Sequence, residues 1–465
     1  MKRLFGTDGV RGVAGKFPLD EKTVIRIGEA LARTLMKNGR APRVVIGRDT
    51  RASGPEIEAA LTRGIESQGG SVDRGGVLTT PAVACVTKTL GYDAGVVISA
   101  SHNPYRDNGI KVFSAEGFKL PDALEMEIER QVLDGPQAEP GAPQAGDGAG
   151  GRHIDAGALQ ETYLDALRAA VPPGTSFAGR RLILDCAHGA ASALAPRLFK
   201  SLGAEVVALN DAPDGSNINE GCGALHPDRL GSEVARQGAW LGLAFDGDAD
   251  RCLPVDATGR VLDGDYVLCL VARDLRRAGR LHGDATVGTV MTNLWLEQAL
   301  KQDGIKVVRA AVGDKYVLEE MQRGGFVLGG EQSGHVIFLE RATTGDGLLT
   351  GLMLMELLQR TGQDLAAWAS TITPCPQILV NVPVRERPPL ATHPVIGPAI
   401  AAEEKRLEGR GRVLVRYSGT EPKARIMVEG EPRAAVEDAV GRLKSVIEGA
   451  IGVSPAGHEA PVRTR

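Results

Sequence analysis

The chain has 465 residues, of which 43% are hydrophobic and 24% charged, a balance typical of soluble globular proteins with several hydrophobic cores. Its net charge of -4 and its aromatic content of 4% argue against a nucleic-acid-binding protein, which would need a basic surface and stacking platforms. No apolar run has the length of a membrane-spanning helix, and the N-terminus lacks the apolar stretch of a signal peptide, so we expect a cytoplasmic protein.

Three segments repeat one pattern: a β-branched run, a polar or glycine-rich loop, a helical stretch and a second β-branched run. They are residues 43–79, 181–209 and 285–312. Each predicts a βαβ unit with a parallel, right-handed crossover. Because the three units are far apart in the sequence, they predict three related α/β domains.

Residues 134–151 are rich in proline, alanine and glycine and predict a linker or a long surface loop. Their GxGxxG spacing follows no predicted strand, so we expect no dinucleotide site there. After the third α/β segment, strands are predicted at 378–384, 412–418 and 423–430 and helices at 395–408 and 432–449. This pattern indicates a smaller α+β domain. The expected domains are 1–150, 151–255, 256–373 and 374–451, with a disordered tail at 452–465.

The six cysteines form no CxxC pair, and most lie in apolar runs. We expect buried free thiols in a reducing compartment rather than disulfides or a cysteine-ligated metal. The cysteines are at positions 85, 186, 222, 252, 269 and 375.

Three carboxylates follow the apolar run LGLAF, at Asp246, Asp248 and Asp250. Close carboxylates repel one another unless a cation or protons neutralise them, and oxygen ligands suit a hard divalent ion. An EF-hand is excluded because Arg251 stands where its glycine is required and Ala257 where its glutamate is required. The sequence therefore predicts a Mg²⁺ site, the alternative being a solvated acidic turn.

Three further loops carry groups suited to a phosphorylated sugar. Ser101 and His102 follow a buried-type strand in VVISASHNP, where a catalytic serine and a plain polar turn both remain open because GxSxG is absent. Glu331 and Ser333 in GGEQSGH can hydrogen-bond sugar hydroxyls, or simply form a polar loop. In RYSGTEP at 416–422, hydroxyls, backbone N–H groups and nearby cations favour phosphate over an ordinary charged hairpin.

The chain resembles the α-D-phosphohexomutase superfamily along nearly its whole length. FGTDGVRG, ISASHNP, DGDADR, GEQSGH and RYSGTEP occur in the order and spacing of that family. The resemblance implies four domains around one cleft, three α/β and one smaller C-terminal α+β domain. The wording of FGTDGVRG and GEQSGH is most similar to that of bacterial members that act on glucosamine phosphate.

The resemblance also implies residue roles. Ser101 would be the phosphoserine and would bind Mg²⁺ together with the three aspartates. Arg11, His102 and Lys111 would line the transfer site, with Lys111 as the general acid/base after nearby Arg11 and Mg²⁺ lower its pKa towards neutrality. Substrate contacts are expected from Arg251, Asp314, Lys315, Glu331, Ser333, Arg416, Ser418, Gly419, Thr420 and Arg425.

The implied reaction moves the Ser101 phosphate onto O1 of glucosamine 6-phosphate. The resulting 1,6-bisphosphate then reorients and returns its 6-phosphate to Ser101. This second transfer releases glucosamine 1-phosphate for cell-wall precursor synthesis. A homodimer is also implied. The alternatives are a phosphomannomutase or phosphoglucomutase on the same scaffold, a catalytically silent sugar-phosphate sensor, and a metal-dependent phosphatase.

Overall fold

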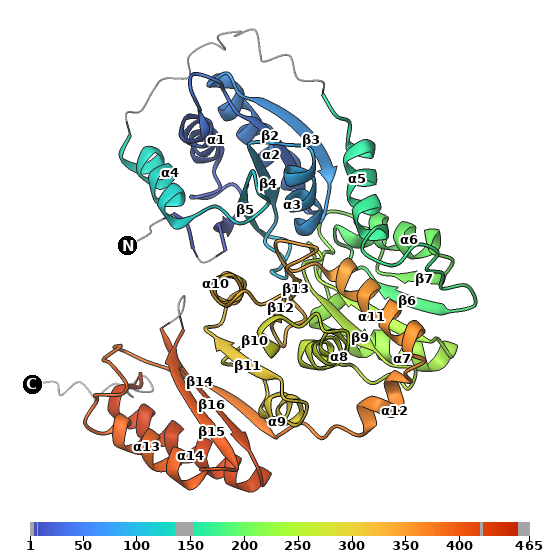
Figure 1. The fold of residues 1–465 in the computed structure, drawn as a ribbon. Coiled ribbons are helices and arrows are strands. Elements are labelled where there is room, and N and C mark those ends of the chain that lie inside the picture. Colours follow the sequence, from blue (N-terminus) through green and yellow to red (C-terminus); the bar gives the residue numbers. More distant parts are fainter. Residues whose placement is uncertain (1–3, 7, 136–152, 419–421, 454–465) are drawn as a thin grey trace, which may run out of the picture. The chain divides into compact units, whose positions relative to one another are not determined.

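The computed structural model describes residues 4–6, 8–135, 153–418 and 422–453 (Figure 1). The chain divides into two compact units, the first made of Met1–Met291 and Asp303–Ser370 and the second of Thr292–Gln302 and Thr371–Arg465. Among the described residues, every helix is too short or too polar to cross a membrane. All six cysteines are free thiols, and all except the partly exposed Cys85 are buried.

Three sheets of the first unit share one strand order. Counting the four strands that these sheets share in chain order, the first lies between the second and the third and runs parallel to both. The fourth strand pairs antiparallel with the third. The orders are β3-β2-β4-β5, β7-β6-β8-β9 and β11-β10-β12-β13, and β1 adds an antiparallel edge strand beside β5. The prediction of three related α/β domains is confirmed, as are the parallel pairs joined by helices.

The elements of the first sheet and its helices fill the region before the linker. They are β1 (Val10–Val13), α1 (Glu21–Leu35), β2 (Arg43–Arg48), α2 (Gly54–Ser67), β3 (Ser71–Val77), α3 (Thr80–Thr89), β4 (Ala94–Ile98), β5 (Asp107–Ser114) and α4 (Asp122–Asp134). Helix α1 begins where Asp20 accepts a hydrogen bond from Thr23 N at 3.0 Å. Val24, Ile27 and Leu31 then recur at helical spacing and are buried in the same core as strand β4.

The second and third sheets follow with their helices. They comprise α5 (Ala156–Arg168), β6 (Arg181–Asp185), α6 (Ala191–Ser201), β7 (Glu205–Leu209), η1 (Gly223–Leu225), α7 (Asp228–Gln237), β8 (Leu241–Phe245), β9 (Cys252–Val255), α8 (Gly264–Arg277), η2 (His282–Asp284), β10 (Ala285–Thr289), α9 (Leu294–Gln302), β11 (Lys306–Ala310), α10 (Asp314–Gly324), β12 (Leu328–Gly330), β13 (Val336–Phe338), α11 (Gly347–Thr361) and α12 (Leu365–Ser370). Helix α9 groups with the second unit, because Leu294 N donates to Glu429 and Asn293 exchanges two hydrogen bonds with the Cys375 backbone.

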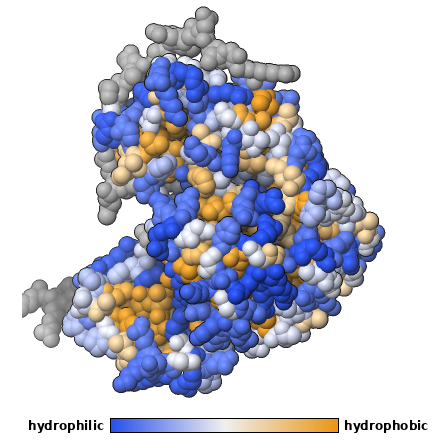
Figure 2. Space-filling model, viewed as in Figure 1, coloured by the Kyte–Doolittle hydropathy of each residue, from blue (hydrophilic) through white to orange (hydrophobic). Residues whose placement is uncertain are grey.

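The second unit contains the antiparallel sheet β14-β16-β15. Its elements are β14 (Gln377–Pro383), α13 (Ile396–Arg406), β15 (Gly411–Tyr417), β16 (Lys423–Gly430) and α14 (Arg433–Ile451). The smaller α+β domain is therefore confirmed, with its elements within two residues of the predicted bounds. One sheet face packs in a core with α13 and α14. Hydrophobic residues also gather on the visible surface of this unit (Figure 2). Leu379 of β14 is 47% exposed.

Candidate active site

Ser101 lies directly after β4 in a backbone conformation that neighbouring groups hold in place. Its φ of 52° is left-handed, which costs a non-glycine residue about 1–2 kcal/mol. Its N–H donates to Ser99 Oγ at 2.9 Å, and its carbonyl accepts from Arg51 Nη2 at 3.0 Å and from Asn219 Nδ2 at 2.9 Å. These contacts offset the strain and fix the direction of the hydroxyl.

Arg51 is the main support of this loop. Its side chain is fully buried, pairs with Asp49 at 2.9 Å, and also donates to the carbonyls of Asn103 and Pro104. Burial raises the pKa of Asp49, although the charge of Arg51 opposes that effect. The sequence analysis missed Arg51, although charged residues directly after the buried strand β2 were an available signal.

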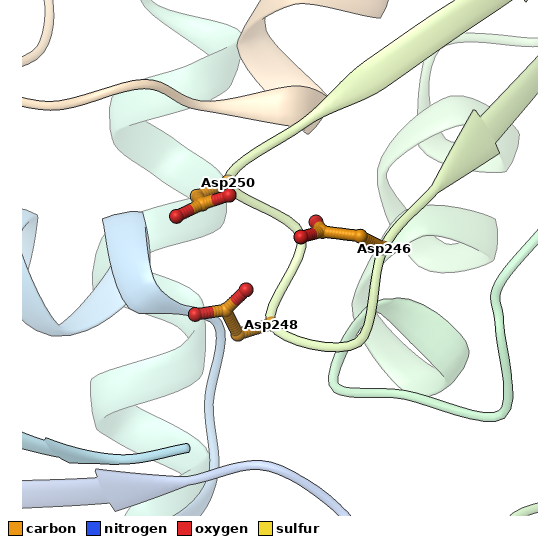
Figure 3. A group of neighbouring side chains, drawn as sticks. All are labelled: Asp246, Asp248 and Asp250. Carbon is orange, nitrogen blue, oxygen red and sulfur yellow. The ribbon is translucent and has the colours of Figure 1, made fainter. Parts of the chain in front are cut away.

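The structure brings Asp246, Asp248 and Asp250 together in the β8–β9 loop. Their carboxylates converge on one side of this loop (Figure 3), and one oxygen from each lies within 4.8 Å of the others. All three residues are buried, at 0%, 0% and 5% exposure. Ser101 Oγ donates to Asp246 Oδ2 at 2.7 Å, so the serine of the first sheet meets the acidic loop of the second.

Charge and burial act differently on these carboxyls. Burial, together with repulsion from Asp250 and Asp248, raises the pKa of Asp246. Burial also acts to raise the pKa of Asp250, but the charges of Lys111 and His335 outweigh it and the pKa is lowered. The nearby cations therefore outweigh burial at Asp250 but not at Asp246.

The donor set fits a divalent metal ion. Asp248 Oδ2 accepts from Thr80 Oγ1 at 2.6 Å and from Lys111 Nζ at 2.9 Å. The other oxygen, Asp248 Oδ1, is buried and accepts no hydrogen bond from any residue that the structure describes. A buried carboxylate oxygen without a partner is costly, and a hard cation with oxygen ligands would relieve that cost.

Lys111 lies among carboxylates, and this corrects the expected direction of its pKa. Its Nζ lies 2.9 Å from Asp248, 3.2 Å from Asp8 and 3.6 Å from Asp250. Burial and Arg11 both act to lower the pKa of Lys111, as predicted for Arg11, but the three carboxylates outweigh them and raise it. The sequence analysis did not count these partners, so the predicted fall towards neutrality is wrong for these residues by themselves.

Arg11 and His102 flank Ser101. Arg11 pairs with Asp8, and its Nη1 lies 3.5 Å from the Ala100 carbonyl. His102 Nδ1 lies 3.2 Å from Ser101 Oγ, so these sequence neighbours are also in contact. Burial, followed by the charges of Arg251 and Arg11, lowers the pKa of His102 to about 4. His102 is therefore neutral at pH 7.

The third sheet contributes the loop between β12 and β13. Glu331 Oε1 accepts from Gly313 N at 3.0 Å, and Ser333 Oγ lies 3.3 Å from Glu331 Oε2. The two predicted sugar contacts thus adjoin the Gly313 turn. Beside the acidic loop, Arg251 Nε lies 3.9 Å from Asp246 and 3.8 Å from Asp250.

The predicted substrate residues Asp314 and Lys315 begin helix α10. Asp314 pairs with Lys119 of the first domain. Lys315 Nζ lies 2.5 Å from Asp122 and 3.8 Å from Glu319, so its charge already has protein partners. The sequence analysis missed Lys119, which has no local pattern to mark it, and gave no role to Asp8 although Asp8 lies inside FGTDGVRG.

In the second unit, Arg416 and Arg425 face each other across β15 and β16. Burial and the charge of Arg425 lower the pKa of Arg416. Arg425 Nη2 also lies 3.4 Å from Ser418 Oγ. Two cations placed opposite one another favour an anion as their common partner. The predicted Gly419 and Thr420 lie outside the described residues.

Family models match the chain in four consecutive parts. They are phosphoglucomutase/phosphomannomutase alpha/beta/alpha domain I at residues 2–139, domain II at 161–259, domain III at 263–375 and the C-terminal domain at 379–444. Together they cover most of the chain.

Individual relatives give the same result. Phosphoglucosamine mutase of Moorella thermoacetica is 50% identical over 97% of this chain and 100% of its own. A solved phosphoglucomutase/phosphomannomutase family protein of Burkholderia thailandensis superposes with a TM-score of 0.77 at 26% identity, covering 97% of this chain and 98% of that one. The N-acetylphosphoglucosamine mutase of Aspergillus fumigatus, solved with GlcNAc-6P and magnesium, shares the fold at a TM-score of 0.62 and 20% identity, covering 97% and 96%.

Proposed function

We propose, for a chain that belongs to the phosphoglucomutase/phosphomannomutase family, a phosphoglucosamine mutase reaction in which Ser101 carries the transferred phosphoryl group. The chain interconverts glucosamine 6-phosphate and glucosamine 1-phosphate, the activity in the name of relatives that are 45–50% identical over nearly its whole length. The observation that carries the role of Ser101 is its buried hydroxyl, 2.7 Å from Asp246 in a triad of carboxylates.

We assign the metal site to Ser101, Asp246, Asp248 and Asp250, and the ion to Mg²⁺. The oxygen-only donor set and the unpartnered Asp248 Oδ1 support this assignment. A bound Mg²⁺ would neutralise negative charge on the phosphoryl group during transfer.

The surrounding side chains supply the remaining steps. Protonated Lys111 gives its proton to Ser101 Oγ as the P–Oγ bond breaks, and receives one from the attacking sugar hydroxyl. Arg11 and Arg251 stabilise the oxygens of the moving phosphoryl group, because phosphoryl transfer depends mainly on positioning and charge. Neutral His102 contacts Ser101 and keeps water from its oxygen.

The substrate is held by two further groups of side chains. Glu331 and Ser333 hydrogen-bond the sugar hydroxyls, with the loop of Asp314 and Lys315 beside them. Arg416, Ser418 and Arg425, with Gly419 and Thr420, hold the phosphate that is not being transferred. The intermediate is glucosamine 1,6-bisphosphate, which reorients between the two transfers.

A cytoplasmic location and a homodimer complete the proposal. The six free thiols support the location, because reduced cysteines are the rule in the cytoplasm. The homodimer follows from the family resemblance.

The proposal is tested by comparing kcat/KM for glucosamine, glucose and mannose 6-phosphates with Mg²⁺ and the phosphorylated enzyme. We expect a preference for glucosamine of 100-fold or more, about 2.7 kcal/mol in the transition state. Equal or faster turnover of glucose or mannose phosphate would contradict the assigned substrate. A Ser101→Ala variant should lose turnover, and inorganic phosphate released in place of an isomer would indicate a phosphatase.

A further inference from the structure

Six side chains from three sheets form a closed ring in which acidic and basic groups alternate. Lys111 Nζ lies 3.2 Å from Asp8 and 3.6 Å from Asp250. His335 continues the ring, with Nδ1 3.6 Å from Asp250 Oδ1 and Nε2 4.0 Å from Asp314 Oδ2. Lys119 closes it by pairing with both Asp314 and Asp8.

Lys119 pairs with carboxylates of two domains, and among the described residues it forms no ion pair with the acidic triad. It lies between β5 and α4, its side chain is 17% exposed, and it spans from Asp8 to Asp314 at the start of α10. The segment around it also touches the third domain through Thr343 Oγ1, which donates to the Gly117 carbonyl. The position of Lys119 is therefore fixed from both sides.

Asp8 is the partner through which Lys119 reaches the transfer site. The carboxylate of Asp8 contacts Lys111 and Arg11, two cations that the proposed mechanism uses. Its backbone has little room to shift, because the adjacent Gly9 approaches the Ile110 carbonyl so closely that a Cβ would lie 2.3 Å from that oxygen. The direction of the Asp8 side chain thus depends on its cationic partners.

We propose that Lys119 is a positioning residue, which holds Asp8 against Lys111 and Arg11 and ties the Asp314 loop to the transfer site. The proposal rests on the function assigned above. Without the charge of Lys119, the carboxylates of Asp8 and Asp314 would share one partly buried space with no cation between them. Their repulsion would turn Asp8 away and disturb Lys111 and Arg11.

The test is a set of kinetic variants of the full-length phosphorylated enzyme. Lys119→Met, which keeps the length of the side chain and removes its charge, should lower kcat about 10-fold or more, with a smaller change in KM. Lys119→Arg should stay within about 3-fold of the wild type, because it retains the charge. Lys119→Met should lower kcat much less when it is added to Asp314→Asn than when it is added to the wild type, because the repelling carboxylate is already gone.

This coupling separates positioning from a loss of fold, which would lower kcat by a similar factor in either background. Arg63→Met is the matched control, because it removes a cation from an exposed pair with Glu21 in the same domain and should leave kcat unchanged. If Lys119→Met is unstable, Lys119→Gln is used with the same expectation and with the same Asp314→Asn partner.

Three results would overturn the proposal: a kcat within about 3-fold of wild type for the uncharged variant, a loss confined to KM, or multiplicative losses in the double variant. All rates are ratios to the wild type on whichever sugar phosphate it turns over best. A different preferred sugar would thus refute the assigned substrate without affecting this test, and a wild type that transfers no phosphate from Ser101 would refute the proposed function itself.

Discussion

At the scale of single residues, Asp248 links the acidic loop to two side chains of the first domain, Thr80 and Lys111. One of its oxygens accepts from Thr80 and Lys111, and the other has no hydrogen-bond donor among the described residues. Thr80 belongs to the first domain and Asp248 to the acidic loop of the second. A side chain oriented by two donors on one oxygen presents the other oxygen in a fixed direction, as metal ligands require.

Replacing this carboxylate should weaken metal binding. We expect Asp248→Asn to lower the affinity for Mg²⁺ by about 10-fold or more, because a neutral amide is a poorer ligand for a hard cation. Isothermal titration of the purified protein with MgCl₂ measures this directly, without an activity assay. Asp303→Asn, in an exposed pair with Arg273, is the control and should bind as the wild type does. Unchanged affinity in Asp248→Asn would remove Asp248 from the metal site.

At the scale of elements, the site is built from equivalent loops. In each of the three α/β sheets, the loop between the third and fourth strands carries the candidate residues: Ser101 after β4, the aspartates after β8, and Glu331 after β12. Parallel strands present their carboxyl ends at one edge of a sheet, where ligands bind in α/β folds. The shared strand order therefore places three different sets of candidate residues in equivalent loops.

Close approach between two of these loops leads to a prediction about glycine. A Cβ at Gly247 would lie 2.6 Å from the Ser101 carbonyl, so Gly247→Ala should push the acidic loop from the serine loop. We expect about 100-fold lower kcat and a lower midpoint of urea unfolding. In contrast, Gly441→Ala in helix α14 meets no atom within 4 Å and should stabilise the protein by about 0.5–1 kcal/mol.

Equal activity of the two alanine variants would show that the contact between the loops does not position Ser101. Urea unfolding followed by circular dichroism, with initial rates measured at 25 °C, compares them on one scale. Both variants add one methyl group to a glycine. At Gly247 the methyl group would meet the neighbouring loop, and at Gly441, in helix α14, it would meet no atom within 4 Å. The pair therefore distinguishes the effect of close packing from the general effect of adding a side chain.

At the scale of the whole molecule, the candidate groups are divided between the two compact units. The first contains Ser101, the aspartates and the loop of Glu331 and Ser333, and the second contains Arg416, Ser418 and Arg425. In the proposed reaction, a bisphosphate would turn between two transfers. A phosphate clamp on a unit other than that of the serine suits this requirement, because binding and transfer can then be controlled separately.

This division predicts a kinetic separation. Arg416→Gln should raise KM for glucosamine 6-phosphate about 10- to 100-fold while changing kcat less, because it removes a phosphate contact and leaves the transfer site intact. Steady-state rates with the phosphorylated enzyme test this. Arg433→Gln, in an exposed pair with Glu437, is the matched control and should leave KM unchanged. A loss confined to kcat would instead place Arg416 in the transfer step.

Much of this architecture could be predicted from local patterns. The alternation of β-branched runs and helical stretches predicted the α/β sheets and the C-terminal elements, because each element buries residues at its own period. The three aspartates could be found because they follow a buried strand within six residues. Arg51 could have been noticed because charged residues directly follow the buried strand β2, whereas nothing near Lys119 in the sequence distinguishes it from an ordinary surface cation.

The sequence by itself determined the family, the order of the domains and which loops carry chemical groups, since these depend on motifs and on short-range periodicity. Only the tertiary structure decided how those groups act on one another. Lys119 meets Asp8 from 111 residues away and Asp314 from 195 residues away, and Lys111 has a raised rather than a lowered pKa. Electrostatic interactions depend on distance and burial in space, which neighbouring positions in a sequence do not specify.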